Sequence, residues 1–156
     1  MDSSQIHLLV NHIPITGVLI GLFVLIAGLS FKKDLVKITA LGIFIFSGLT
    51  AILAQLTGEG AEKLAKKAGN FSETMIHMHE EYSRAFFAIV VILSFTAIVT
   101  YYLQLKKKRK LFYMYIVVLI LAIGSAFVGY TVSNSGLQIH HPEIRNSKDV
   151  IDVTLR

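Results

Sequence analysis

The six histidines are the residues that most directly suggest a chemistry, because the chain contains no cysteine. They form three close pairs along the sequence: His7 with His12, His77 with His79, and His140 with His141. Neutral imidazole binds zinc, copper and iron, and two imidazoles from separate helices can hold haem iron from both sides. The lack of cysteine excludes iron–sulfur clusters, thiolate zinc sites and covalently attached haem.

Helical periodicity limits which member of the second pair can face the inside of a helix bundle. His77 and His79 are two residues apart, which is about 200° around an ideal helix, so only one of them can point inward. His79 shares a face with Tyr82 and Ser83, whereas His77 shares a face with charged residues. We therefore expect His79 to be the inward member.

The first pair is constrained in the same way. His7 and His12 are five residues apart, which is about 140° around a helix, so they cannot both reach one centre unless Pro14 distorts the backbone. His12 directly precedes an uncharged run and lies deeper than His7. We expect His12 and His79, or His77 in place of His79, to face each other as ligands of a cofactor.

Three chemistries fit this set of residues. The first is haem b, held between imidazoles. The second is direct binding of copper, zinc or iron, with four further candidate ligands: His140, His141, Glu59 and Glu80. The third is a set of hydrogen-bonding or pH-titrating groups without any ligand. The chain has no H-E-x-x-H motif, phosphate loop or nucleophile–base pair, so an autonomous enzyme is not expected.

Four long apolar runs must position these histidines. The chain has 156 residues, of which 54% are apolar, and its mean hydropathy is +0.64. A bilayer core needs about 20 helical residues to cross it. The runs predict a single all-α integral membrane four-helix bundle, with spans at 8–31, 35–56, 82–105 and 111–132 and a polar tail over 133–156.

The basic residues predict the orientation of the bundle. The two short connections carry Lys32, Lys33 and the run 106–110, whereas the termini and the connection over 57–76 carry no excess of positive charge. The positive-inside rule then predicts that both termini lie on the outer, periplasmic side of the bacterial inner membrane. All six histidines lie on that side, with Tyr82 and Tyr130 near the same border. The net charge of +5 is explained by topology, and no nucleic-acid partner is expected.

Several local features are also expected. The first helix begins near Gln5 or Ile6 and is kinked at Pro14. The spacing of Gly17 and Gly21 predicts a close helix–helix contact. The second helix should end near Glu59. A separate surface helix should follow over 59–69, the third helix should begin near residue 71, and the tail should end in a short strand over 150–155.

Residues 6–15, with two histidines ahead of a proline that begins an apolar helix, resemble the opening of a known family. This is the DUF2231-type family of small four-helix bacterial membrane proteins. The likeness continues in 56–58 at the end of the second helix, in the histidines that begin the third, and in 124–129. The family is similar to cytochrome b-type subunits and is sometimes joined to Rieske-type domains, which implies redox work. This chain departs from the pattern by lacking a proline after His7 and by carrying residues 140–143.

We therefore expect a membrane protein with a haem b or other metal centre near its outer face. It would take part in electron transfer as an oligomer or as a subunit of a larger assembly. Its partner would be quinol or a redox protein at the outer face. The alternatives are a metal-binding membrane protein without haem and a non-catalytic structural subunit.

Overall fold

The computed structural model describes residues 3–68, 73–106 and 111–140. These residues form helices α1 (Ser3–Val10), α2 (His12–Ser30), α3 (Asp34–Ala68), α4 (Glu73–Leu105) and α5 (Leu111–His140). Four stretches are long and apolar enough to cross a membrane: Gln5–Ser30, Asp34–Leu64, Glu73–Leu105 and Leu111–Ile139. The protein is therefore an all-helical bundle with four candidate membrane spans.

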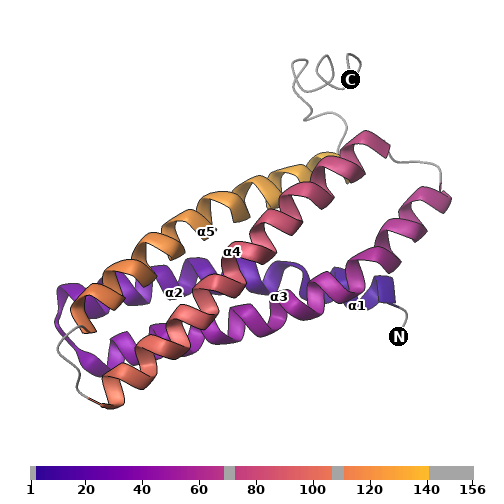
Figure 1. Ribbon diagram of the computed structural model, residues 1–156. Coiled ribbons are helices and arrows are strands. Elements are labelled where there is room, and N and C mark those ends of the chain that lie inside the picture. The colour runs from indigo at the N-terminus through magenta and orange to yellow at the C-terminus, as the bar shows by residue number, and fades with distance from the viewer. Residues whose placement is uncertain (1–2, 69–72, 107–110, 141–156) are drawn as a thin grey trace.

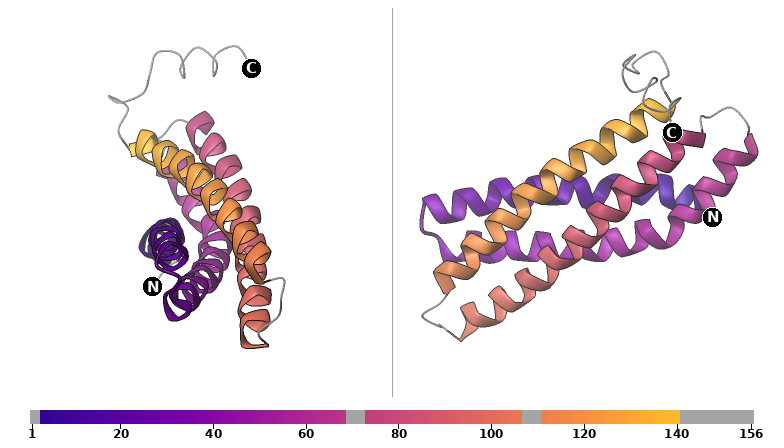
Figure 2. Two further views of the ribbon diagram at one scale, coloured as in Figure 1. Left: turned by 90° about the vertical axis from the view of Figure 1, so that its left-hand side faces the viewer. Right: turned by 45° about the horizontal axis from the view of Figure 1, so that its top comes forward.

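The helices pack as two pairs. α2 lies along α3, and α4 lies along α5. The two pairs are joined by contacts of α3 with α4 and of α2 with α5. The short helix α1 packs mainly on α3. Figure 1 shows the α4–α5 pair crossing the α2–α3 pair obliquely, and Figure 2 shows the same arrangement from two further sides. At one end of the bundle, α1 and α4 begin and α3 and α5 terminate; we call this the histidine end. The opposite end, where α3 and α5 begin, is the lysine end.

Close approach between α2 and α3 follows from small residues. A Cβ atom on Gly21 would lie 2.6 Å from the Phe44 ring, and one on Gly17 would overlap the Ser47 hydroxyl. Phe44 and Ser47 are both fully buried. Helices that pack in an apolar medium gain contact area in this way, because the glycines let the backbones approach. The close contact predicted from the spacing of Gly17 and Gly21 is confirmed.

The break between α1 and α2 lies at Asn11, three residues before Pro14, where a kink was expected. Proline has no N–H to donate to the carbonyl four residues earlier, which is that of Val10, and its ring crowds that carbonyl. α1 ends at Val10 and α2 begins at His12, while the Asn11 N–H still donates to the His7 oxygen at 2.9 Å. Asn11 has a φ of −60° and a ψ of −30°, so the backbone follows a helical path through the break.

Two helices run further than the sequence indicated. α3 continues through Gly58 and Gly60 to Ala68, where an end near Glu59 and a separate surface helix over 59–69 were expected. Two glycines inside a helix cost about 1 kcal/mol each, and the packing of α1 along this stretch offsets that cost. Two i,i+4 ion pairs lie along this stretch: Lys63–Glu59 at 3.9 Å and Lys66–Glu62 at 2.6 Å.

α5 likewise extends beyond residue 132, where the polar tail was expected to begin, and ends at His140. The added turns pack against the first turns of α4, which begins at Glu73. The start expected near residue 71 and the strand expected over 150–155 lie outside the described residues.

A polar network closes the lysine end. Lys37 Nζ lies 2.6 Å from Asp34 Oδ1 and 5.2 Å from the centre of the Tyr115 ring, close enough for a cation–π contact. The Tyr115 hydroxyl donates to Gln104 Oε1 at 3.2 Å, and the Tyr115 side chain is only 2% exposed. These contacts join α3, α4 and α5 at one point.

Candidate functional site

The histidine end gathers residues that are far apart in the sequence. Figure 1 shows that α1, the last turns of α3, the first turns of α4 and the last turns of α5 lie at the same end of the bundle. His7, His12, His77 and His79 therefore belong to one end of the molecule, as does His140, the last described residue of α5. His141 lies outside the described residues.

His7 is half-buried between α1 and α3. Its Nδ1 lies 3.0 Å from the Ala54 carbonyl oxygen and 3.4 Å from the Thr57 hydroxyl. The Thr57 hydroxyl donates to the Leu53 carbonyl at 2.9 Å, so its oxygen is able to accept. A Cβ on Gly58 would lie 3.6 Å from the His7 ring, so the imidazole rests directly over this glycine.

His79 makes a matching contact between α4 and α5. Its Nδ1 lies 3.0 Å from Ser135 Oγ, and its Nε2 lies 3.4 Å from Ser83 Oγ. Ser135 donates its hydroxyl hydrogen to the Val132 carbonyl at 2.9 Å. A Cβ on Gly136 would lie 3.2 Å from the His79 ring, so this imidazole also rests over a glycine of the neighbouring helix.

These hydrogen bonds assign the tautomer of both rings. A carbonyl oxygen can only accept, so Nδ1 of His7 carries the proton and donates it to Ala54. The Ser135 hydrogen is committed to Val132, so Nδ1 of His79 donates to the Ser135 oxygen. In each neutral ring the lone pair then lies on Nε2. This is the arrangement in which a protein orients an imidazole as a metal ligand.

The other members of the two pairs point outward. His77 is exposed, with its Nδ1 4.0 Å from a carboxylate oxygen of Glu81. His12 is exposed as well. The sequence favoured His12 over His7 as the inward residue. The structure has the reverse, because the two residues lie about 140° apart around the helix and the side that carries His7 faces α3.

The carboxylates proposed as metal ligands are engaged or exposed. Glu80 Oε1 accepts from Arg84 at 3.0 Å, and Glu59 is an exposed partner of Lys63. Among residues 3–68, 73–106 and 111–140, no three His, Asp or Glu side chains converge on a point where they would share a metal ion. His7 and His79 belong to different helix pairs, α1–α3 and α4–α5.

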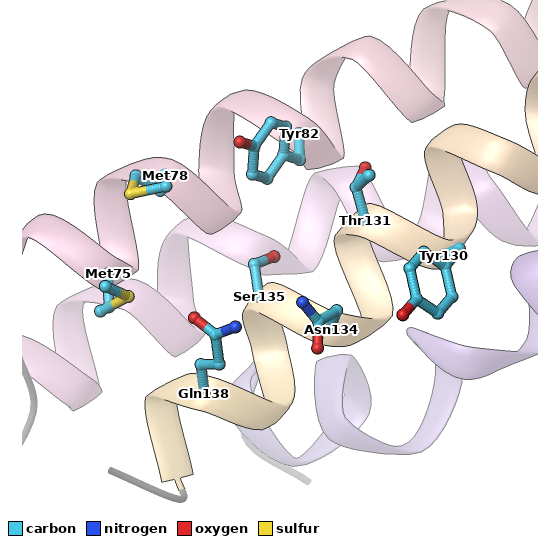
Figure 3. Close-up of a pocket in the computed structure, with 8 residues that line it drawn as sticks. All are labelled: Met75, Met78, Tyr82, Tyr130, Thr131, Asn134, Ser135 and Gln138. Atoms are coloured by element: carbon cyan, nitrogen blue, oxygen red, sulfur yellow. The ribbon is translucent and has the colours of Figure 1, made fainter. Parts of the chain in front are cut away.

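A small hollow of about 130 Å³ lies beside His79, between α4 and α5. Figure 3 shows its lining: Met75, Met78 and Tyr82 from α4, with Tyr130, Thr131, Asn134, Ser135 and Gln138 from α5. Ser135 thus belongs both to the hollow and to the hydrogen bond of His79. Sequence reasoning missed these residues apart from the two tyrosines. The feature of the sequence that could have indicated them is the helical spacing of residues 131, 134, 135 and 138. This spacing places them on one face only if α5 continues past residue 132.

Comparison with protein-family models, with curated proteins and with solved structures finds no match to this chain.

Proposed function

We propose that the protein is a multi-pass protein of the bacterial inner membrane that carries a redox centre at its histidine end, on the outer side. The centre would be haem b or another metal, and the protein would pass electrons as a subunit of a larger assembly. The observation that carries this proposal is that His7 and His79 make matching contacts at one end of the bundle. Both rings are half-buried, and both donate Nδ1–H, which places the ring lone pair on Nε2; in His79 this nitrogen lies 3.4 Å from Ser83 Oγ.

The donor set fits haem iron, because non-covalent haem is held by neutral imidazoles and needs no cysteine. Donation of Nδ1–H to Ala54 or Ser135 makes the opposite nitrogen more basic and holds the ring in one orientation. The hollow beside His79 has the size of one small ring rather than of a macrocycle. His7 and His79 are the residues that would hold a haem, which when bound would supply one-electron chemistry.

The distribution of histidines supports exchange of electrons at one face only. Within the described residues, all histidines belong to the histidine end, and the lysine end carries the network of Asp34, Lys37, Tyr115 and Gln104 instead. A path for electrons across the bilayer normally needs a second centre near the other face. The partner is therefore quinol or a redox protein on the outer side, and the opening over residues 6–15 resembles a family similar to cytochrome b-type subunits.

A second function is favoured by the same contacts. Each inward imidazole joins two helices over a glycine, and such contacts also serve a non-catalytic structural subunit. A third function, direct binding of copper, zinc or iron without haem, uses the same end and the same donors. These functions differ in what the purified protein contains.

The test is the reduced-minus-oxidised visible spectrum of the detergent-purified protein from cells well supplied with haem, together with metal analysis of the same sample. Sharp α and β bands with a Soret band are expected. Stoichiometric metal without these bands would indicate the haem-free metal site. The absence of both the bands and metal would indicate the structural subunit.

The orientation is tested separately. A reporter that is active only in the periplasm, fused after Lys108, is expected to be silent, and the same reporter fused after Lys67 is expected to be active. The opposite pattern would overturn the proposed topology.

A further inference from the structure

The hollow between α4 and α5 has the chemistry of a site for a neutral ligand. Its lining combines two methionine thioethers, two tyrosine rings, two side-chain amides and two hydroxyls, and none of these groups is charged at neutral pH. A phosphate or carboxylate ligand would find no cation in this lining. An uncharged ligand with a flat apolar body and hydrogen-bonding substituents would find partners for both parts.

The size of the hollow selects the kind of flat body. A cavity of about 150 Å³ in another protein binds benzene. The volume here, about 130 Å³, is therefore close to that of a single six-membered ring. The hollow therefore has room for a single ring.

The position of the hollow suggests what carries the ring. Met75 is buried at its inner wall, while Tyr130 is 68% exposed and Tyr82 38% exposed at its rim. Arg84 follows Tyr82 closely, and the next twenty-one residues of α4, 85–105, carry no charge. The rim is thus level with the border between the polar and apolar parts of α4. Tyrosine favours this level in membrane proteins, and an amphiphile there places its head in the hollow and its tail among the lipids.

We propose that this hollow binds the single-ring head group of a membrane quinone or quinol. The amide of Asn134 lines the hollow and would donate a hydrogen bond to a ring oxygen, and the thioethers of Met75 and Met78 would pack on the ring. Ser135 links the bound head to the imidazole of His79, because its oxygen accepts from Nδ1 at 3.0 Å. The inference rests on the membrane placement and electron-transfer role proposed above, but binding of the head group requires no metal.

The methionines provide a direct test. The chain contains four methionines: Met1, Met75, Met78 and Met114. The full-length protein, labelled with ¹³C in the methionine methyl groups and purified in detergent, would be titrated with a ubiquinone analogue that carries a decyl tail. We expect saturable shifts of the Met75 and Met78 signals. Met114 lies near the start of α5, at the lysine end, and its signal is expected to stay in place.

Variants sharpen this test. Thr131→Phe fills the hollow and is expected to weaken binding by roughly tenfold or more. Asn134→Leu replaces a hydrogen-bond donor with an apolar side chain of similar size and is also expected to weaken binding. Thr16→Phe on α2 is the matched control, because Thr16 is exposed and does not line the hollow. Unchanged helicity and an unchanged Met114 signal would show that each variant is folded.

Three outcomes would overturn the inference. The first is the absence of shifts when the analogue saturates the micelle. The second is equal shifts at Met114 and in Thr131→Phe, which would mean partition into detergent. The third is the same shifts with 1-decanol, which would mean that the hollow takes lipid tails. The visible spectrum of the same sample reports on the redox centre independently, so either proposal can fail without the other.

Discussion

The two ends of the bundle hold polar residues in different ways. At the lysine end, a charged pair and a buried tyrosine form a closed network, since Lys37 lies 2.6 Å from Asp34 and over the Tyr115 ring. At the histidine end, two half-buried neutral imidazoles make the polar contacts between helices. Each imidazole uses Nδ1 to join two helices, and its lone pair lies on Nε2, which in His79 is 3.4 Å from Ser83 Oγ.

The difference indicates where the bundle is built for stability and where it is suited to binding. The lysine end joins α3, α4 and α5 at one point through groups that satisfy each other. The histidine end keeps α1–α3 and α4–α5 as separate contacts, with a hollow beside one of them. Substitutions at the lysine end should therefore reduce stability alone, whereas substitutions at the inward histidines should change what the protein binds.

The largest effect on stability is expected from Tyr115→Ala. Truncating a fully buried aromatic side chain costs about 3 kcal/mol or more, and here the hydrogen bond to Gln104 is lost as well. Thermal unfolding in detergent, followed by circular dichroism, measures this loss. Tyr113→Ala is the control, because Tyr113 is 71% exposed on the same turn region and should change little. Equal effects of the two substitutions would refute the proposed role of the network.

A smaller and more discriminating effect is expected from the two glycines under the histidines. Alanine favours a helix over glycine by about 1 kcal/mol. At Gly58 the added Cβ would lie 3.6 Å from His7, an ordinary contact, so Gly58→Ala should raise the free energy of unfolding. At Gly136 it would lie 3.2 Å from His79, which forces the ring to move.

Gly136→Ala should therefore gain less stability than Gly58→Ala or lose some, and it should displace the His79 ring from Ser135. Thermal unfolding and the His79 side-chain NMR signals measure the two consequences. If both substitutions stabilise the protein equally, the His79 ring is not held as tightly as the structure indicates.

The smallest effect concerns an exposed ion pair at the end of α3. The hydrogen bond and charge of Glu62, 2.6 Å away, raise the pKa of Lys66 above its ordinary value of 10.5. Because the folded-state pKa is the higher one, the contribution of this pair is complete below pH 10.5 and is lost as the pH rises through the folded-state pKa. Amide signals of the last turn of α3 should report this fraying, and Glu62→Gln should abolish its dependence on pH.

Much of the bundle could be predicted from local sequence. Apolar runs long enough to span a bilayer and the helix break before Pro14 each follow from one continuous stretch of sequence. The continuation of α3 through Gly58 could not be predicted in this way, because the two glycines there disfavour a helix locally and the packing of α1 overrides them.

The candidate site was predictable in part. Periodicity identified His79 as the residue that shares a face with Ser83, and the structure has these two side chains 3.4 Å apart. The choice between His7 and His12 depends on which side of α1 packs on α3, and the spacing of the two residues does not state this. The hollow joins Met75 to Gln138 across two helices, so it follows only from their packing.

The most direct test of the central claim compares four substitutions by reduced-minus-oxidised visible spectroscopy of the purified protein: His7→Ala, His79→Ala, His12→Ala and His77→Ala. The account predicts that the Soret and α bands of the wild type are lost in the first two variants and kept in the last two, whose histidines are exposed. Bands that survive in His7→Ala and His79→Ala but disappear in His12→Ala or His77→Ala would contradict the assignment of the inward pair. A wild-type spectrum without bands would contradict haem altogether.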